Sequence, residues 1–315
     1  MRARNTCARS QRGAALVMAL LVVSLATVTA VGIASALSYS LQRSGNLLEL
    51  ARARDLADAA EFWVRTELRA GMAAPRNEDR PSPAAPDPAP ALPEPPAWLT
   101  GHRLALGDAQ GCLNVNNLLR EGAPDPVTRR RFERLLAQLD VNPELLPALL
   151  DWLDTDSEPR PGGGAEDDHY SRRDPPYRAA NAPLGHPSEL RLLRHADTAA
   201  LARLLPHLCA LPEHTQVNVN HASAAVLRAL GDDISERSAR RLAAAAREQP
   251  FLTLDAFLAH PALARSTLDA EDLGVSSRYR WLQVDIRLQR LDYRRLTLLR
   301  EGIVVRRERR YPGDT

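Results

Sequence analysis

The hydrophobic pattern begins with an uncharged stretch that is long enough to cross a membrane as a helix. Residues 14–42 carry no charged side chain and consist mainly of Ala, Val and Leu. About 20 apolar residues suffice for a helix to span the hydrocarbon core of a bilayer. Beyond this stretch, apolar residues recur at steps of three and four as far as Leu68, and polar residues occupy the other positions. The pattern predicts one continuous helix over residues 14–71, apolar at first and amphipathic later.

The residues before the apolar stretch indicate how the helix is oriented and processed. Residues 1–13 hold four Arg and no acidic residue, which predicts that this end stays on the cytoplasmic side of a membrane. Arg12-Gly13 directly precedes the apolar residues, a pattern that resembles a prepilin leader, which is cut after its Gly. We therefore expect cleavage between Gly13 and Ala14, with the helix kept on the mature protein. Two alternatives stay open: an uncleaved anchor, and an ordinary secretory signal cut near Ala34-Ser35-Ala36.

A proline-rich connector separates this helix from the rest of the chain. Nine prolines lie within residues 75–96, so the segment cannot continue a helix and is expected to be extended. Two short strands, 98–106 and 112–115, are predicted within residues 97–116. Near the end of the chain, residues 276–315 alternate apolar and polar positions on both sides of a turn at 290–292, which predicts a β-hairpin of strands 279–289 and 293–306.

Strands are therefore expected before and after a helical block. Leu-rich helical runs fill residues 117–211, and the helical pattern continues through 212–275 as a second segment. The motif Leu113–Asn116 is echoed by Val217–Asn220, and each copy precedes a helical run. Two short strands are rarely stable alone, which disfavours two independent tandem domains. The predicted fold class is α+β: a pilin-like long N-terminal α-helix plus a small antiparallel sheet, with a large inserted α-helical domain.

Composition excludes several kinds of enzyme. All 41 basic residues are Arg, so no Lys can serve a phosphate-binding loop, a Schiff base or a Ser-x-x-Lys nucleophile. The chain also lacks Gly-x-Ser-x-Gly, His-Glu-x-x-His and the Gly-rich dinucleotide motif. The formal charge of +2 falls to −2 once the four Arg of residues 1–13 are removed, so net charge does not point to nucleic acid. We expect a protein without catalytic activity.

Two of the three cysteines stay on the chain after loss of the leader. Cys7 lies in the leader, whereas Cys112 and Cys209 belong to the part expected in the oxidising periplasm. An even pair in that compartment favours a disulfide between Cys112 and Cys209. Two buried free thiols are the alternative that the sequence leaves open.

An acidic loop is the candidate ligand-binding site. Seven carboxylates lie within residues 151–168, in a stretch interrupted by prolines and three consecutive glycines. Asp154, Asp156 and Glu158 place oxygens at alternate positions, as calcium-binding loops do. The EF-hand pattern fails, because its sixth position is Pro159 and no Glu occupies its twelfth. A solvated salt-bridge loop is the alternative, since four arginines lie nearby: Arg160, Arg172, Arg173 and Arg178. Zinc is not expected, because the eight His are scattered.

Several motifs, in a fixed order, carry a resemblance to a known family. They are GCLNVNNL at 111–118, DWLDTDSEPRPGGGAEDDHY at 151–170, DPPYRAANAPL at 174–184, Ser188-Glu189-Leu190 and VNVNHASAAVL at 217–227. Together with the leader, they resemble the type II secretion minor pseudopilin called general secretion pathway protein K. The resemblance covers most of the chain outside the connector. It implies a large pseudopilin with an inserted α-domain, placed at the tip of a short periplasmic pseudopilus that supports protein export.

The resemblance also implies partners, a location and a metal. Minor pseudopilins I and J are the implied neighbours, with H and the major pseudopilin as further partners. A prepilin peptidase would cut the leader and methylate Ala14, and residues 14–36 would lie in inner-membrane lipid as a single span, with the bulk of the chain in the periplasm. Calcium bound in the α-domain of this family favours a structural calcium ion over salt bridges, with these expected ligands: Asp154, Asp156, Glu166, Asp167 and Asp168.

Met18 departs from the general pilin pattern. It occupies the fifth mature position, where most pilins and pseudopilins carry Glu. A buried carboxylate there needs a cationic partner, usually the amino terminus of a neighbouring subunit, and is costly without it. A subunit at the tip has no neighbour above it, so an apolar residue at Met18 fits a tip position. The alternative is that Met18 is one more lipid-facing residue.

A membrane-anchored periplasmic DNA-binding protein is the alternative function. Residues 217–260 resemble the helix-hairpin-helix module of periplasmic DNA-uptake proteins, which grips phosphate through backbone amides at a Gly-apolar-Gly hairpin. The corresponding stretch here is 231–234, Gly-Asp-Asp-Ile, which places two carboxylates where a phosphate would lie. Their repulsion is expected to cancel much of the attraction of four nearby arginines, so no nucleic acid partner is expected: Arg237, Arg240, Arg241 and Arg247.

Overall fold

A single long helix forms the spine of the molecule. The computed structural model describes residues 10–73, 92, 94–289 and 291–310; the leader residues 1–9 and most of the proline-rich connector lie outside them. Helix α1 runs over Ser10–Ala73, 64 residues without a break, and contains the predicted 14–71 helix. At 1.5 Å per residue it is about 96 Å long. Among the described helices, α1 alone is long and apolar enough to span a membrane.

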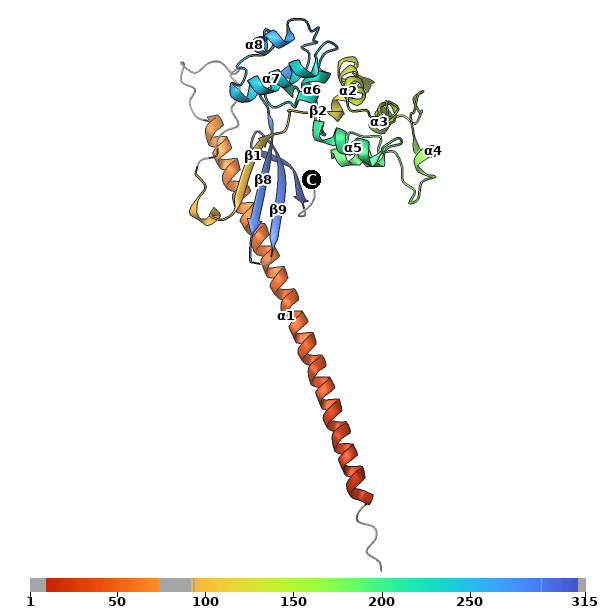
Figure 1. Ribbon diagram of the computed structural model, residues 1–315, viewed down its shortest axis with the longest axis vertical. Helices are drawn as coiled ribbons and strands as arrows, with labels where there is room; N and C mark the ends of the chain where they lie inside the picture. The colour runs from red at the N-terminus through yellow and green to blue at the C-terminus, as the bar shows by residue number, and fades with distance from the viewer. Residues whose placement is uncertain (1–9, 74–91, 93, 290, 311–315) are drawn as a thin grey trace, which may run out of the picture.

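The sheet is four-stranded and antiparallel, in the order β1-β8-β9-β10. Its strands are β1 (Arg103–Asp108), β8 (Tyr279–Arg287), β9 (Asp292–Arg300) and β10 (Ile303–Arg310). Leu106 of β1 lies opposite Leu282 of β8, so the pairing joins segments from either side of the helical block. The predicted fold class is confirmed: a long N-terminal helix, a small antiparallel sheet and an inserted helical domain, which lies at the end opposite the start of α1 (Figure 1).

Small residues bring α1 close to the sheet. Ala53, Ala57 and Ala60 recur at steps of four and three, and all three are fully buried. Residues at this spacing share one face of a helix. They pack in one apolar cluster with β8 side chains such as Leu282 and Val284. Because alanine projects so little, the helix backbone approaches the sheet closely along this stripe.

The inserted domain is one body with a single core. Its elements are α2 (Pro126–Gln138), α3 (Leu145–Leu153), α4 (Asp167–Tyr170), α5 (Thr198–Leu204), α6 (Ala224–Ala229), α7 (Glu236–Glu248), α8 (Leu254–Leu258), and the 3-10 turns η2 (Val115–Leu118), η3 (Pro187–Leu192), η4 (Leu205–His207) and η5 (Pro261–Leu263). Short strand pairs complete it: β2 (Leu113–Asn114) with β5 (Leu208–Cys209), β3 (Leu119–Arg120) with β4 (Ala123–Pro124), and β6 (Val217–Asn218) with β7 (Leu273–Gly274). One hydrophobic cluster extends from Leu113 to Val275, so the two helical segments predicted from the sequence, 117–211 and 212–275, share a core.

The repeated Asn motif has the same structural role in both copies. Asn116 donates through Nδ2 to the carbonyls of Leu184 (3.0 Å) and Leu211 (2.9 Å), and its Oδ1 accepts from the Leu184 amide (2.8 Å). Asn220 donates to the carbonyls of Phe251 and Val275 (both 3.0 Å), and accepts from the Phe251 amide (2.8 Å). Each Asn therefore fastens a short strand to two distant loops through the same three bonds.

A disulfide joins Cys112 and Cys209, with Cα atoms 5.8 Å apart and a sequence separation of 97. It lies beside the parallel pair of β2 and β5, in which Asn114 is the partner of Cys209. The bridge therefore connects the exit from β1 to the last strand of the first helical segment.

Two strand predictions within residues 97–116 are wrong in detail. Trp98 belongs to a 3-10 turn, η1 (Ala97–Leu99), and the strand begins only at Arg103. Leu113–Asn114 pairs in parallel with β5 and takes no part in the four-stranded sheet. The physical reason is a turn at Asp108, whose Oδ1 accepts from the amides of Gln110 and Gly111, both at 2.7 Å, and ends β1.

The predicted C-terminal hairpin is a three-stranded meander. Residues 293–306 do not form one strand, because a second turn at Glu301-Gly302 separates β9 from β10. Both turn residues have positive φ, 50° and 77°, as the tightest hairpin turns require. Arg65 of α1 donates through Nε to the carbonyl of Gly302 at 2.9 Å, so the spine helix supports this turn.

Candidate metal centre

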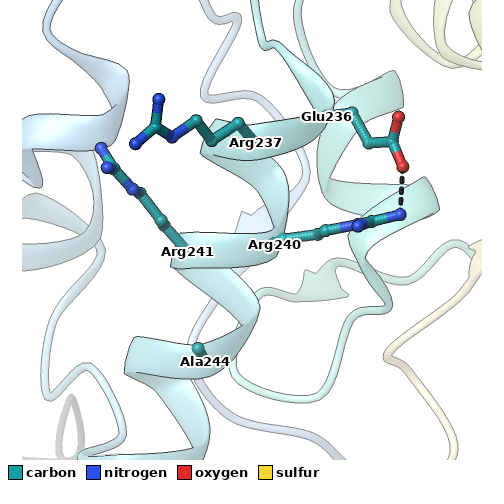
Figure 2. A pocket seen from close by; sticks show the side chains of 5 residues that line it. All are labelled: Glu236, Arg237, Arg240, Arg241 and Ala244. Carbon is teal, nitrogen blue, oxygen red and sulfur yellow. Dashed lines mark hydrogen bonds and ion pairs between the residues drawn. The ribbon is translucent and has the colours of Figure 1, made fainter.

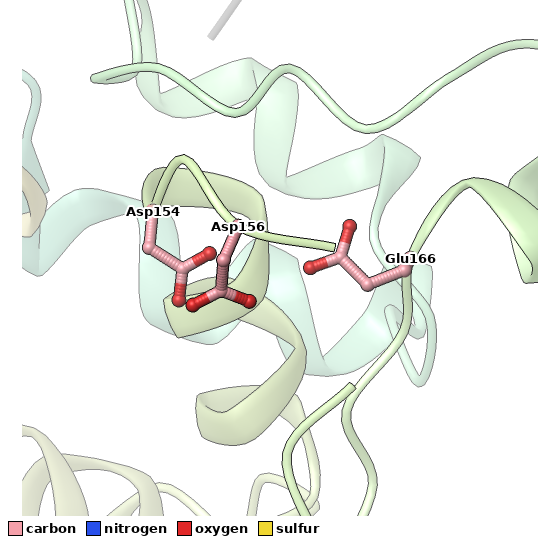
Figure 3. A group of neighbouring side chains, drawn as sticks. All are labelled: Asp154, Asp156 and Glu166. Carbon is pink, nitrogen blue, oxygen red and sulfur yellow. The ribbon is translucent and has the colours of Figure 1, made fainter. Parts of the chain in front are cut away.

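The acidic loop connects α3 to α4. Asp154 is the residue that follows the last turn of α3, and Glu166 directly precedes the first turn of α4. Asp156 lies two residues beyond Asp154 on the same loop. The chain leaves the end of α3, forms the acidic loop, and begins α4 close to the end of α3. This path brings both ends of the loop together (Figure 3).

Three carboxylates converge at that point. One oxygen from each of Asp154, Asp156 and Glu166 lies within 4.8 Å of the others. Asp154 and Glu166 are only 5% and 4% exposed, whereas Asp156 is open to solvent. Both oxygens of Glu166 and Oδ1 of Asp154 are buried without a hydrogen-bond partner among the residues that the structure describes. Buried oxygens of this kind are costly unless a cation or a donor satisfies them.

The electrostatics of this cluster favour a bound cation. Burial, together with the charges of Asp151, Asp154 and Asp156, raises the pKa of Glu166 to about 7. Burial also raises the pKa of Asp154. Carboxylates that share a small volume repel one another, and a positive ion between them removes that repulsion. Carboxylate oxygens are the ligands that calcium prefers.

Asp151 has a different role from these three residues. It is fully buried, and its oxygens accept from the backbone amides of Arg160 (3.1 Å) and Ala165 (2.8 Å). The guanidinium of Arg160 also donates to Asp151, at 2.9 Å, and to Asp154. Asp151 therefore folds the loop, and Arg160 neutralises part of its charge. The salt-bridge alternative thus holds for Asp151 and for one oxygen of Asp154, whereas Glu166 forms no ion pair within the described part of the chain.

The glycines of the loop permit this close approach. A Cβ on Gly164 would lie 2.3 Å from Oδ2 of Asp151 and 2.4 Å from the backbone nitrogen of Arg160. Gly163 has φ of 120°, and a Cβ there would lie 2.6 Å from that of Glu144. A side chain at Gly164 would force the loop away from Asp151, and one at Gly163 would force it away from Glu144.

Two of the expected ligands lie outside the cluster. Asp167 accepts from the amide of Ala179 at 2.9 Å. The side chain of Asp168 is 98% exposed and lies 3.8 Å from Arg172. They do not join the group formed by Asp154, Asp156 and Glu166, and their role as ligands stays a prediction. Both residues belong to the first turn of α4, where each step along the helix rotates the side chain by about 100° away from Glu166.

Asn181 is a residue of this site that the sequence did not single out. Its Nδ2 donates to the backbone carbonyl of Asp156 at 3.0 Å, and its Oδ1 is buried without a hydrogen-bond partner among the described residues. Asn181 has φ of 46°, a left-handed conformation that Asn tolerates. Its position in the DPPYRAANAPL motif was the sequence feature that could have indicated a role for Asn181 at this site.

Comparison with known proteins decides the family. One family model of type II secretion system protein K matches residues 111–213, and a second matches residues 217–276. The type II secretion system protein K of Pseudomonas aeruginosa is 34% identical over 282 residues, which cover 86% of this chain and 83% of that protein. This chain belongs to the type II secretion system protein K family. The protein K of Klebsiella pneumoniae is 33% identical over 279 residues, 81% of each chain.

A solved structure of a protein K shares the fold. It is found in the crystal structure of the GspK-GspI-GspJ complex from the enterotoxigenic Escherichia coli type 2 secretion system. The TM-score is 0.67 at 25% identity, and the match covers 86% of this chain and all of that chain. The resemblance to the minor pseudopilin K family is thus confirmed by sequence and by structure.

The DNA-binding alternative receives no support from these comparisons. In the structure, α6 and α7 pack against each other around the hairpin at Gly231. Arg134 of α2 bonds the carboxylate of Asp232, and Asp233 is exposed beside it. A phosphate at the hairpin would therefore meet two carboxylates, of which Arg134 neutralises Asp232 and leaves Asp233 charged.

Proposed function

We propose that the chain works as a non-catalytic minor pseudopilin at the tip of the type II secretion pseudopilus, where it supports assembly and protein export. The observation that carries this proposal is the division of α1. Every described side chain from residue 15 to residue 48 is exposed, although most are apolar. From Ala53 onward, the same helix packs on the sheet. An apolar helix that the chain itself leaves uncovered is suited first to lipid and then to sister helices.

The location and processing follow from the same helix. We expect a single inner-membrane span with the bulk of the chain in the periplasm, because the arginine-rich residues 1–13 favour the cytoplasm. Gly13 and Ala14 lie on the helical backbone of α1. A prepilin peptidase would cut between them and methylate Ala14. The N-terminal mass of the mature protein tests this: a start at Ala14 supports it, whereas a start near Ser38 or an intact Met1 contradicts it.

The tip position rests on Met18 and on the size of the inserted domain. Met18 is 70% exposed on α1 and offers no carboxylate to a subunit above it. Minor pseudopilins I and J are the proposed neighbours, since the structural relative was solved in a GspK-GspI-GspJ complex. Pseudopilin H and the major pseudopilin would lie below them. An M18E variant that assembles and secretes as well as the native chain would contradict the tip argument.

A structural calcium ion is proposed for the acidic loop. Asp154, Asp156 and Glu166 would hold it, because their oxygens converge and three of those oxygens have no hydrogen-bond partner in the described part of the chain. When bound, the ion supplies positive charge that cancels the repulsion among these carboxylates. The chain's own residues prepare the site: Asp151 and Gly164 close the loop, and Arg160 orients Asp154. The ion would then tie the end of α3 to the start of α4.

The function is tested in a strain that lacks this chain. The full chain is expected to restore export, whereas residues 49–315 exported as a soluble fragment behind an ordinary signal are not. Immunoblots of periplasmic and membrane fractions control for the amount of each form. Restoration of export by the soluble fragment would contradict the proposal, because the apolar part of α1 would then be dispensable.

A further inference from the structure

Helix α7 carries a row of arginines on its solvent face. Its buried residues are Ala239, Leu242, Ala243 and Ala246, of which the first three belong to the core cluster of the inserted domain. The opposite face is exposed and holds these residues: Glu236, Arg237, Arg240, Arg241, Ala244, Arg247 and Glu248. The side chain of Ser235 caps the helix by accepting from the Ser238 amide at 3.1 Å. The arginines therefore lie on the exposed face of a helix that is capped at its start and packed on the domain core.

Three of these arginines, Arg237, Arg241 and Arg247, have no partner within the described part of the chain. Glu236 pairs with Arg240, one turn further along the helix. Arg237 and Arg241 form neither an ion pair nor a hydrogen bond with any described residue. In Figure 2 both guanidinium groups extend to the same side, away from the Glu236–Arg240 pair. Two unneutralised positive charges one turn apart repel each other and attract an anionic ligand.

The shape of the surface suits a polypeptide. Arg237, Arg240, Arg241, Glu236 and Ala244 line a shallow hollow, in which the small Ala244 leaves room beside the helix. Arg237 and Arg241 are about 6 Å apart along the axis. Carboxylates on alternate residues of an extended chain are about 6.7 Å apart, so two of them match this spacing. A guanidinium binds a carboxylate through two parallel hydrogen bonds.

The acidic groups around the arginine row limit the length of the ligand. Asp232 and Asp233 precede the helix, and Glu248 ends it. A long polyanion that ran along α7 would meet negative charge at both ends, whereas a short acidic segment fits between them. This argument favours a peptide over a nucleic acid. The surface also lies in the domain farthest from the membrane end of α1, where a partner has access (Figure 1).

We propose that the exposed face of α7 binds a short acidic segment of a partner protein, with Arg237 and Arg241 each holding one carboxylate. The site is separate from the acidic loop, and it does not depend on the tip position or on a bound metal. Arg240 contributes less, because Glu236 already neutralises it. The expected affinity is modest and dependent on salt, since the charges are exposed.

Fluorescence anisotropy with the full chain in non-ionic detergent tests the proposal. The probe is a labelled peptide of alternating Asp and Gly, compared with its Asn counterpart and with a short single-stranded DNA of equal charge. The R237Q/R241Q variant is expected to lose about fivefold or more in affinity for the Asp peptide at low salt. The matched control R129Q/R172Q removes two exposed charges elsewhere and is expected to change affinity less than twofold.

A charge-reversal variant distinguishes loss of the binding site from loss of the fold. R237E/R241E is expected to bind an alternating Arg and Gly peptide that the native chain does not bind. Thermal unfolding of each variant checks that the fold persists. Equal affinity of R237Q/R241Q and the native chain for the Asp peptide would overturn the proposal. So would an absence of binding by the native chain, or a tighter binding of the DNA that is lost in R237Q/R241Q.

Discussion

Glu61 of α1 accepts two hydrogen bonds from the guanidinium of Arg307 on β10, at 2.9 and 2.7 Å. Thr297 of β9 donates to the same carboxylate at 3.1 Å, and Arg295 lies 3.5 Å away. Glu61 is only 2% exposed, although it lies on a helix that is largely open to solvent. The spine helix is therefore bonded to the last two strands of the sheet by charge as well as by apolar packing.

Replacement of Glu61 by Gln is expected to destabilise the union of α1 and the sheet. The change leaves Arg295, which is 5% exposed, with the exposed carboxylate of Asp58 as its remaining counter-charge. Loss of one partner of a buried ion pair costs about 3 kcal/mol in the free energy of unfolding. Chemical denaturation of the full chain in non-ionic detergent measures this change in the free energy of unfolding. The control is Asp55→Asn, an exposed position on the same helix, and an equal effect of both substitutions would contradict the assignment.

Ala57→Leu is expected to push α1 away from the sheet. Ala57 is fully buried, so a larger side chain overpacks the contact and costs about 2 kcal/mol. Ala59→Leu, two residues further along and exposed, serves as the matched control and is expected to be nearly neutral. Thermal unfolding of both variants gives the comparison. If the two variants unfolded at the same temperature, the alanine stripe would not be a close contact.

Calcium is expected to stabilise the inserted domain. At a concentration 100 times its dissociation constant, a ligand adds about 2.7 kcal/mol to the free energy of unfolding. A chelator is therefore expected to lower the melting temperature by about 5 °C, and added calcium to restore it. Glu166→Gln is expected to abolish this response. Asp168→Asn is expected to keep it, because that side chain is 98% exposed and outside the cluster. The reverse result for the two variants would refute the ligand set.

The metal-free chain is expected to become less stable as the pH rises through neutrality. The pKa of Glu166 is raised from 4.5 to about 7 by burial and neighbouring carboxylates, so protonation of this group favours the fold. That contribution is complete below about pH 4.5 and is lost as the pH passes about 7. Unfolding at pH 5.5 and pH 8 in the presence of chelator measures the difference. Glu166→Gln removes the titrating group, so this part of the pH dependence disappears if Glu166 is its source.

Local patterns predicted the elements whose hydrophobic period is visible within one segment. The apolar and then amphipathic period predicted α1, and Leu-rich runs predicted α2 and α3. The repeat of Leu113–Asn116 at Val217–Asn220 was also visible, but only the structure showed that Asn116 and Asn220 make the same three bonds. Their bonding partners are far away in sequence, so no local period encodes them.

The sequence by itself determined the spine helix, the inserted position of the helical domain and the stretch that holds the candidate metal site, because residue periodicity and charge density are local properties. Tertiary structure alone decided that Asp154, Asp156 and Glu166 converge while Asp168 faces solvent. It also decided that β1 pairs with β8 while Leu113–Asn114 joins β5. Strand pairing and side-chain convergence depend on which distant segments pack together, and that is settled by the free energy of the whole fold.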